Sequence, residues 1–292
     1  MPDEFAFLTA LRAIATHPAA AGLADDTAVL DVVAGRLILT SDTMVESVHY
    51  RPHDPADSIG WKLAAVNLSD LAAKGATPTG CLLNYALSGD ADWDRAFLAG
   101  LDEALTRFAM PLLGGDTVAV PQGAPRSLTL TAIGTAQPNT PLRTGARPGD
   151  ALWVTGQIGS AGFGPDGEPR DLARYLRPQP RLAAGQALAP VATAMMDVSD
   201  GLLIDARRLA EASRVAITID LDAVPLALPG LDPLAAATAG DDYELLFTLP
   251  AGIEPPVAAT RIGVAGVGTG LTLTAGGDPV PLPERLGYRH GG

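Results

Sequence analysis

The chain has 292 residues, of which 47% are hydrophobic, and a formal net charge of -13 at neutral pH. This length suits one large domain or two ordinary ones with a sizeable core. The acidic charge argues against a surface for nucleic acid or anionic membranes, because both select basic patches.

The N-terminus is acidic where a secretory signal would be basic, and no run reaches the ~20 apolar residues of a membrane span. The single cysteine, Cys81, cannot form an intrachain disulfide, so we expect a cytoplasmic protein.

The first half of the chain predicts an α+β domain. Apolar residues recur at helical spacing in three segments, residues 3–16, 57–74 and 93–109. Strands are expected at four places, residues 28–33, 36–40, 81–87 and 128–134, the first two forming a hairpin. Helices would cover one face of this sheet. The other face must be buried by something else, and the sheet of a second copy is one solution.

The second half predicts an α/β domain. Residues 137–150 are dense in turn formers, so we place a domain boundary there and expect domains at residues 1–137 and 138–292. Beyond it, strands are expected at residues 151–156, 216–221 and 243–249, and helices at residues 172–176, 181–189 and 202–212. From residue 261 the pattern is typical of short strands joined by glycine turns.

Aspartates at or near the ends of apolar runs are the clearest candidates for functional residues. They are Asp26, Asp42, Asp70, Asp116, Asp197 and Asp200. Clustered carboxylates repel one another unless cations lie among them, and hard oxygen ligands suit Mg²⁺. The hydroxyls of Thr40, Ser41 and Ser199 lie beside them in the sequence. Several Mg²⁺ ions and few lysines are typical of phosphoryl transfer. For residues 197–202 a plainer interpretation stays open, in which Ser199 or Asp200 is only a helix N-cap.

Other common sites are not indicated. The glycine-rich residues 159–164 lack both the Gly-Lys-Ser/Thr end of a Walker A loop and the Gly-x-Gly-x-x-Gly fingerprint, so a turn is favoured over a phosphate cradle. No Gly-x-Ser-x-Gly nucleophile motif is present. One cysteine and the lack of a predicted helix with paired histidines argue against zinc as the metal.

Several motifs occur in the order that one known family shows, over almost the whole length. The most specific are Asn67-Leu68-Ser69-Asp70-Leu71-Ala72-Ala73 and Asp197-Val198-Ser199-Asp200-Gly201, with Gly114-Gly115-Asp116 and Asp241-Asp242-Tyr243-Glu244 in support. The chain therefore resembles the thiamine-monophosphate kinase family of the aminoimidazole-ribonucleotide-synthetase-like superfamily. The resemblance implies a two-domain fold whose N-terminal sheet pairs across a homodimer into a barrel-like core. It also implies direct in-line transfer of the ATP γ-phosphate to thiamine monophosphate, in thiamine diphosphate biosynthesis.

The resemblance assigns roles to residues at matching positions. Metal ligands would be Asp26, Thr40, Ser41, Asp42, Asp70, Asp116, Asp197 and Asp200, with Asp42 and Asp197 catalytic. ATP contacts would be Gly115, Asp116, Arg143 and Ser199, and the thiamine side would hold His49, Asp241 and Tyr288. Mg²⁺ ions and the backbone at the helix start after Asp200 would hold the phosphates.

Some positions depart from the family pattern, and two alternatives remain. Ala24, Asp241 and Gly291 stand where the family usually has a glycine, a glutamate and an aromatic residue, which weakens the assignment of the acceptor. One alternative is another ATP-using superfamily member, such as selenophosphate synthetase or an amidine-forming ATPase. The other is a non-catalytic maturation or carrier protein of the hydrogenase-maturation type, whose C-terminal cysteine this sequence lacks.

Overall fold

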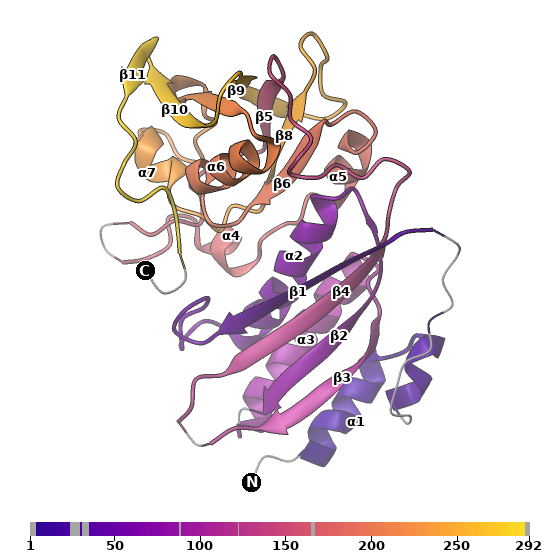
Figure 1. Cartoon of the computed structure of the whole chain (residues 1–292). Coiled ribbons are helices and arrows are strands. Elements are labelled where there is room, and N and C mark those ends of the chain that lie inside the picture. The colour runs from indigo at the N-terminus through magenta and orange to yellow at the C-terminus, as the bar shows by residue number, and fades with distance from the viewer. Residues whose placement is uncertain are drawn as a thin grey trace. The chain divides into compact units, whose positions relative to one another are not determined.

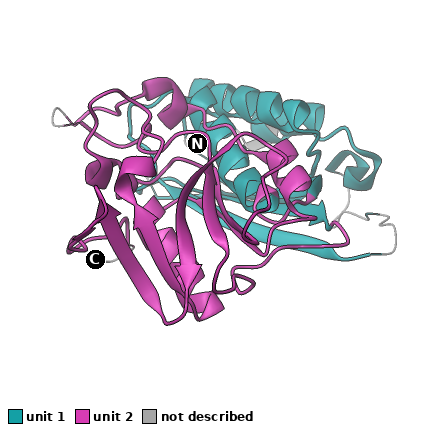
Figure 2. Ribbon diagram, turned by 90° about the horizontal axis from the view of Figure 1, so that it is seen from above, with its two compact units in different colours: residues 1–71, 77–136 teal, residues 72–76, 137–292 magenta. Residues whose placement is uncertain are grey.

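The chain forms two compact units, each built around its own β-sheet (Figure 2). The computed structural model describes residues 4–23, 30, 35–87, 89–121, 123–164 and 167–289. Unit 1 comprises residues 1–71 and 77–136, and unit 2 comprises residues 72–76 and 137–292. Within the described ranges neither sheet closes into a barrel.

Unit 1 contains a four-stranded sheet with helices on one face (Figure 1). Its strands are β1 (Leu37–Val45), β2 (Thr77–Leu87), β3 (Leu112–Ala119) and β4 (Ser127–Thr135), in the order β1-β4-β2-β3. Only the β2–β3 pair is parallel. The helical elements are α1 (Glu4–Ile14), the 3-10 helix η1 (Pro18–Leu23), α2 (Ala56–Ala72) and α3 (Ala91–Arg107).

Glycines let α2 and α3 approach each other closely. A Cβ atom on Gly60 would lie 2.1 Å from the Phe97 carbonyl oxygen, and one on Gly100 would lie 1.7 Å from the Asp57 carbonyl oxygen. Below the helices, the Tyr85 ring of β2 stacks on Phe7 with centroids 4.3 Å apart. These contacts fix the helices against the sheet, and with them the polar residues that α2 carries.

Unit 2 contains a seven-stranded mixed sheet in the order β11-β10-β7-β9-β5-β8-β6. Its strands are β5 (Ala151–Thr155), β6 (Ala194–Val198), β7 (Ala216–Asp220), β8 (Glu244–Leu249), β9 (Ala259–Gly266), β10 (Gly270–Ala275) and β11 (Asp278–Val280). Its helices are α4 (Leu172–Leu176), α5 (Leu182–Leu188), α6 (Leu202–Ser213), α7 (Pro233–Ala237) and the 3-10 helix η2 (Leu221–Ala223). The β10–β7 pair is parallel and the other pairs are antiparallel.

The central strands of unit 2 are buried on both faces. In β5, Leu152 and Val154 join the core that contains α6, whereas Ala151 and Trp153 join a second core that contains Leu188 of α5. Successive side chains of a strand point to opposite faces. A strand covered on both sides is therefore mostly apolar, as β5, β6 and β8 are.

Most predicted elements are confirmed in type and approximate position. The predicted helices of residues 3–16, 57–74, 93–109, 172–176, 181–189 and 202–212 correspond to α1 to α6. The strand predicted at residues 81–87 begins earlier, at Thr77, and no strand was predicted at residues 112–119, where β3 lies. The first strand of the predicted hairpin, residues 28–33, lies almost entirely outside the described residues. In the described ranges no helix is both long and apolar enough to cross a membrane.

Candidate functional site

Unit 1 brings two of the predicted carboxylates together. Thr40 and Asp42 lie on the same face of β1 because they are two residues apart. The Thr40 hydroxyl donates a hydrogen bond to a carboxylate oxygen of Asp70 on α2. One turn earlier on that helix, the wholly buried Asn67 accepts a 3.1 Å hydrogen bond from the Asp42 backbone N–H. The polar side of α2 thus packs on β1 and sets Asp42 beside Asp70.

This arrangement makes the Asp42 carboxylate a strong candidate for binding a cation. Burial, followed by the negative charge of Asp70, raises the pKa of Asp42 to about 6. A divalent cation would relieve both effects, because it offsets the repulsion and favours the ionised form. Two carboxylates and a hydroxyl are donors that Mg²⁺ accepts. Among the residues that the structure describes, however, no three His, Cys, Asp or Glu side chains form a group able to hold a metal ion.

Other predicted residues of unit 1 lie apart from this pair or outside the described ranges. The Ser41 hydroxyl points to the opposite face of β1, where it lies 2.9 Å from the Thr131 hydroxyl. Asp116 is exposed on β3, and strands β4 and β2 separate it from β1. Its neighbour Gly115 has φ +151, and a Cβ atom there would lie 1.8 Å from the Leu83 carbonyl oxygen. Asp26 lies outside the described residues.

His49, predicted on the thiamine side, lies in the turn after β1. Its Nδ1 accepts a 3.0 Å hydrogen bond from the Val45 backbone N–H. An accepting Nδ1 means that the proton of the neutral ring lies on Nε2. The carbonyl of His49 accepts a 3.4 Å hydrogen bond from Lys62, whose side chain is buried on α2. The position of the imidazole is therefore set by both β1 and α2.

In unit 2 the turn that follows β6 is held by the carboxylate of Asp205, a residue to which the sequence analysis gave no role. Asp197 is the next-to-last residue of β6 and is buried, and the cap position of α6 is Gly201, which has no side chain to cap the helix. One carboxylate oxygen of Asp205 accepts hydrogen bonds from three backbone N–H groups, those of Ser199, Asp200 and Gly201, at 3.1, 3.1 and 3.2 Å. The prediction that Ser199 or Asp200 caps this helix is wrong. These three amides, which we expected to hold phosphates, are engaged by Asp205.

A second missed residue, Arg208, neutralises part of this turn. Its Nη1 lies 2.5 Å from an Asp200 oxygen and 2.7 Å from an Asp205 oxygen. Burial still raises the pKa of Asp205 to about 6, although Arg208 and the backbone hydrogen bonds oppose that effect. The sequence signal that could have indicated this pair is the i, i+3 spacing of Asp205 and Arg208 on a predicted helix.

Two distant segments meet this turn through backbone hydrogen bonds. The N–H of Asp241 donates to the Ser199 carbonyl at 2.7 Å, and the N–H of Tyr288 donates to the Asp200 carbonyl at 2.9 Å. Close approach is possible because a glycine precedes Tyr288: a Cβ atom on Gly287 would lie 2.4 Å from the Asp200 carbonyl oxygen. Unit 2 therefore brings two predicted thiamine-side residues to the predicted metal and ATP residues.

Arg143 is the predicted residue of unit 2 that the fold places elsewhere. Its carbonyl accepts a 2.6 Å hydrogen bond from the hydroxyl of Ser213, the last residue of α6. Ser199 precedes the first turn of the same helix. The Arg143 backbone thus lies at the opposite end of α6 from the turn, and only its side chain could approach the turn.

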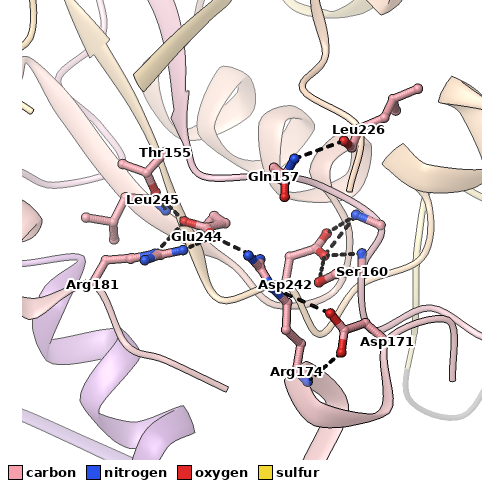
Figure 3. Close-up of polar contacts among 11 residues, drawn as sticks. Thr155, Gln157, Ser160, Asp171, Arg174, Arg181, Leu226, Asp242, Glu244 and Leu245 are labelled. Atoms are coloured by element: carbon pink, nitrogen blue, oxygen red, sulfur yellow. Dashed lines mark hydrogen bonds and ion pairs between the residues drawn. The ribbon is translucent and has the colours of Figure 1, made fainter. Parts of the chain in front are cut away.

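Buried carboxylates next to Asp241 form a further network that we did not predict (Figure 3). Asp242 accepts hydrogen bonds from the backbone N–H groups of Gly159 (2.9 Å) and Ser160 (3.1 Å). Glu244 accepts hydrogen bonds from Arg181, at 2.7 Å from its Nε, and from the Thr155 hydroxyl at 2.7 Å. Burial raises the pKa of Asp242 to about 7, against the effect of the two amides. The glycine-rich residues 159–164 are therefore bound by the same segment that carries Asp241.

Comparison with known proteins matches both halves of the chain. Residues 24–136 match the N-terminal domain of AIR synthase related proteins, and residues 147–255 match the C-terminal domain. A thiamine-monophosphate kinase of Caulobacter vibrioides is 36% identical over an alignment of 325 positions that covers 99% of this chain and 91% of that protein. The crystal structure of thiamine-monophosphate kinase from Stenotrophomonas maltophilia K279a superposes with a TM-score of 0.81 at 34% identity, covering 95% of this chain and 98% of the other. AaThiL complexed with AMPPCP and TMP gives a TM-score of 0.77 at 28% identity, covering 98% and 97%.

Proposed function

The chain belongs to the thiamine-monophosphate kinase family, and we propose that it phosphorylates thiamine monophosphate to thiamine diphosphate with ATP. The observation that carries this proposal is the 36% identity to a thiamine-monophosphate kinase over 99% of the chain. The similarity to a complex with AMPPCP and TMP over 98% of the chain supports the same donor and acceptor. A cytoplasmic enzyme of thiamine diphosphate biosynthesis fits this reaction.

The reaction is a direct in-line transfer. The bond between the γ-phosphorus and the oxygen that remains on ADP breaks, and a bond forms from the γ-phosphorus to a phosphate oxygen of thiamine monophosphate. The acceptor phosphate is already ionised at neutral pH, so no side chain has to act as a strong base. The work of the chain is to position the two substrates and to offset their negative charge.

The donor chemistry of the chain fits Mg²⁺. Thr40, Asp42 and Asp70 provide hard oxygen ligands in unit 1. Burial and the charge of Asp70 raise the pKa of Asp42, and a bound cation would offset both effects. We assign the ligands as predicted, to Asp26, Thr40, Ser41, Asp42, Asp70, Asp116, Asp197 and Asp200. Because the Ser41 hydroxyl faces the other side of the sheet, Ser41 would contribute through its backbone carbonyl. When bound, the metal ions offset the charge of the transferring phosphoryl group.

The remaining assignments follow the same residues. Gly115, Asp116, Arg143 and Ser199 bind ATP, and His49, Asp241 and Tyr288 bind the acceptor. The hydrogen bonds of Asp241 and Tyr288 to the Ser199–Asp200 turn support this division, since they join predicted acceptor residues to predicted ATP and metal residues. Residues 1–137 then form the metal-binding and dimerisation domain and residues 138–292 the second domain.

The open face of the unit 1 sheet supports a homodimer. Four large apolar side chains on this face are exposed by 36% to 65%, and they are Leu37, Leu39, Leu82 and Val118. They lie on β1, β2 and β3, on the side away from the buried Leu83 and Leu130. Soluble monomers seldom expose contiguous apolar patches without a partner. A second copy that pairs its sheet with this one would bury them and give the barrel-like core.

The decisive experiment is an assay of the purified protein with ATP, Mg²⁺ and thiamine monophosphate. We expect thiamine diphosphate and ADP in equal amounts, detected by chromatography and by ³¹P NMR. ATP hydrolysis without thiamine diphosphate, or transfer to a different phosphate ester only, would refute the proposed acceptor. The same assay with unphosphorylated thiamine is the control for acceptor identity, and it should give no product.

A further inference from the structure

Asp242 occupies a position between two residues that are bonded to the end of β6. The N–H of Asp241 donates to the Ser199 carbonyl at 2.7 Å, and the N–H of Tyr243 donates to the Val198 carbonyl at 2.8 Å. Asp241 and Tyr243 have backbone φ angles of 58° and 51°, which residues other than glycine seldom adopt. Such conformations persist only where surrounding contacts enforce them.

The side chain of Asp242 connects this strained segment to the loop of residues 159–164, which we call the glycine loop. Its two oxygens lie 2.9 and 3.0 Å from the Gly159 nitrogen, and the first lies 3.1 Å from the Ser160 nitrogen (Figure 3). Asp242 is only 8% exposed. Buried hydrogen bonds to a carboxylate are among the stronger ones in proteins. Asp242 therefore links the glycine loop directly to the segment that carries Asp241.

The glycine loop also packs directly against the chain that leads into Asp241. A Cβ atom on Gly159 would lie 2.7 Å from the Ala236 Cβ, and one on Gly162 would lie 2.5 Å from the Ala239 Cβ. The next residue, Phe163, is 47% exposed and meets Tyr175 edge-on with ring centroids 5.5 Å apart. The loop is therefore held at its base by Asp242 while it presents an aromatic ring at its surface.

We propose that the glycine loop is part of the acceptor site, that Phe163 contacts the acceptor, and that Asp242 is the positioning residue that fixes the loop and Asp241 relative to each other. This inference rests on the proposed function. Thiamine monophosphate carries a cationic thiazolium ring and an aminopyrimidine ring, and both are favourable partners for an aromatic face. Asp242 itself is buried and touches no substrate. Its effect falls on acceptor binding and leaves ATP binding unchanged.

The test compares the Michaelis constants of the two substrates in four variants. Asp242→Ala and Phe163→Ala should each raise the KM for thiamine monophosphate about tenfold or more and change the KM for ATP by less than about twofold. Asp242→Asn keeps an oxygen that can accept from Gly159 and Ser160, so it should restore most of the acceptor affinity. Asp150→Asn is the matched control, because Asp150 is also buried and accepts a 2.9 Å hydrogen bond from the Arg147 N–H, at the start of β5. It should leave both constants unchanged.

The outcomes separate this inference from the proposed function. A wild-type protein that makes no thiamine diphosphate overturns both. An active wild-type protein whose Asp242→Ala and Phe163→Ala variants keep a normal acceptor KM overturns the inference alone. Equal increases in both KM values for Asp242→Ala would also overturn it, since they indicate a general structural role. If Asp242→Ala does not fold, Phe163→Ala and Asp242→Asn decide the question, because Phe163 is at the surface and the asparagine keeps the hydrogen bonds.

Discussion

Replacing Asp205 with alanine should destabilise unit 2 more than any ordinary helix-capping mutation. The side chain is fully buried. One of its oxygens accepts hydrogen bonds from three backbone N–H groups, and the other accepts a hydrogen bond from Arg208. A hydrogen bond to a charged group contributes about 1.5–3 kcal/mol, and three that share one oxygen are not additive. Loss of one partner of a buried ion pair costs about 3–5 kcal/mol. Arg208 keeps Asp200 as a partner, so we expect about 3–5 kcal/mol in total.

Two further variants make the measurement specific. Asp205→Asn keeps an acceptor for the three amides but turns its NH₂ group toward Arg208, so we expect a loss of about 1–2 kcal/mol. Asp232→Ala removes an exposed N-cap that accepts one 2.9 Å hydrogen bond on α7, for which about 1 kcal/mol is typical. Urea unfolding followed by circular dichroism ranks the free energies of unfolding of the three variants. Hydrogen exchange at residues 199–201 shows whether the loss of stability in the Asp205 variants lies in this turn. The reasoning fails if Asp205→Ala is no worse than Asp232→Ala, or if asparagine is as harmful as alanine.

Three other predictions test different parts of the molecule. Asp42→Asn and Asp197→Asn should each lower kcat by roughly 10³-fold or more under the proposed function, with unfolding midpoints near that of the wild type; a near-normal rate in either would remove that residue from the metal site. The folded state raises the pKa of Asp242 from 3.8 to about 7, so its stabilising effect is complete below about pH 4 and is lost as the pH rises through 7, by up to about 4 kcal/mol. The urea midpoints at pH 5 and pH 8 should therefore differ less in Asp242→Asn than in the wild type. An equal difference in the two proteins would contradict the raised pKa of Asp242. Leu39→Lys, on the open sheet face, should convert a dimer to a monomer in light scattering, whereas a wild-type protein that is already monomeric would refute the proposed interface.

The secondary structure could be predicted because the apolar pattern reports burial directly. The helices α2 and α3 show apolar residues at three- and four-residue spacing, and the strands β5 and β8 are mostly apolar because both of their faces are covered. The beginning of β2 was missed for an equally physical reason. Its first residues include Pro78 and Gly80, which the usual strand pattern excludes, yet they lie where the pairing with β4 shifts register.

The partners of the buried acids could not be predicted, since they depend on contacts across long stretches of sequence. Asp242 binds amides 82 and 83 residues earlier in the chain. Asp205 binds amides only four to six residues away, but on a predicted helix it looks like any other charged residue of the first turn. Sequence patterns show where a carboxylate stands in an element. They do not show whether water, an arginine or a backbone amide will satisfy it.

The aspartates that the sequence groups together therefore belong to different electrostatic environments. Asp200 already has the Arg208 guanidinium at 2.5 Å, whereas Asp42 has the like charge of Asp70 beside it and a raised pKa. A divalent cation gains most where it removes repulsion and offsets burial together, and gains least where an arginine already balances the charge. On this argument the Asp42–Asp70 pair depends on the metal more strongly than Asp200 does. Asp42→Asn is for that reason a sharper test of the proposed metal chemistry than a change at Asp200, whose charge Arg208 already balances.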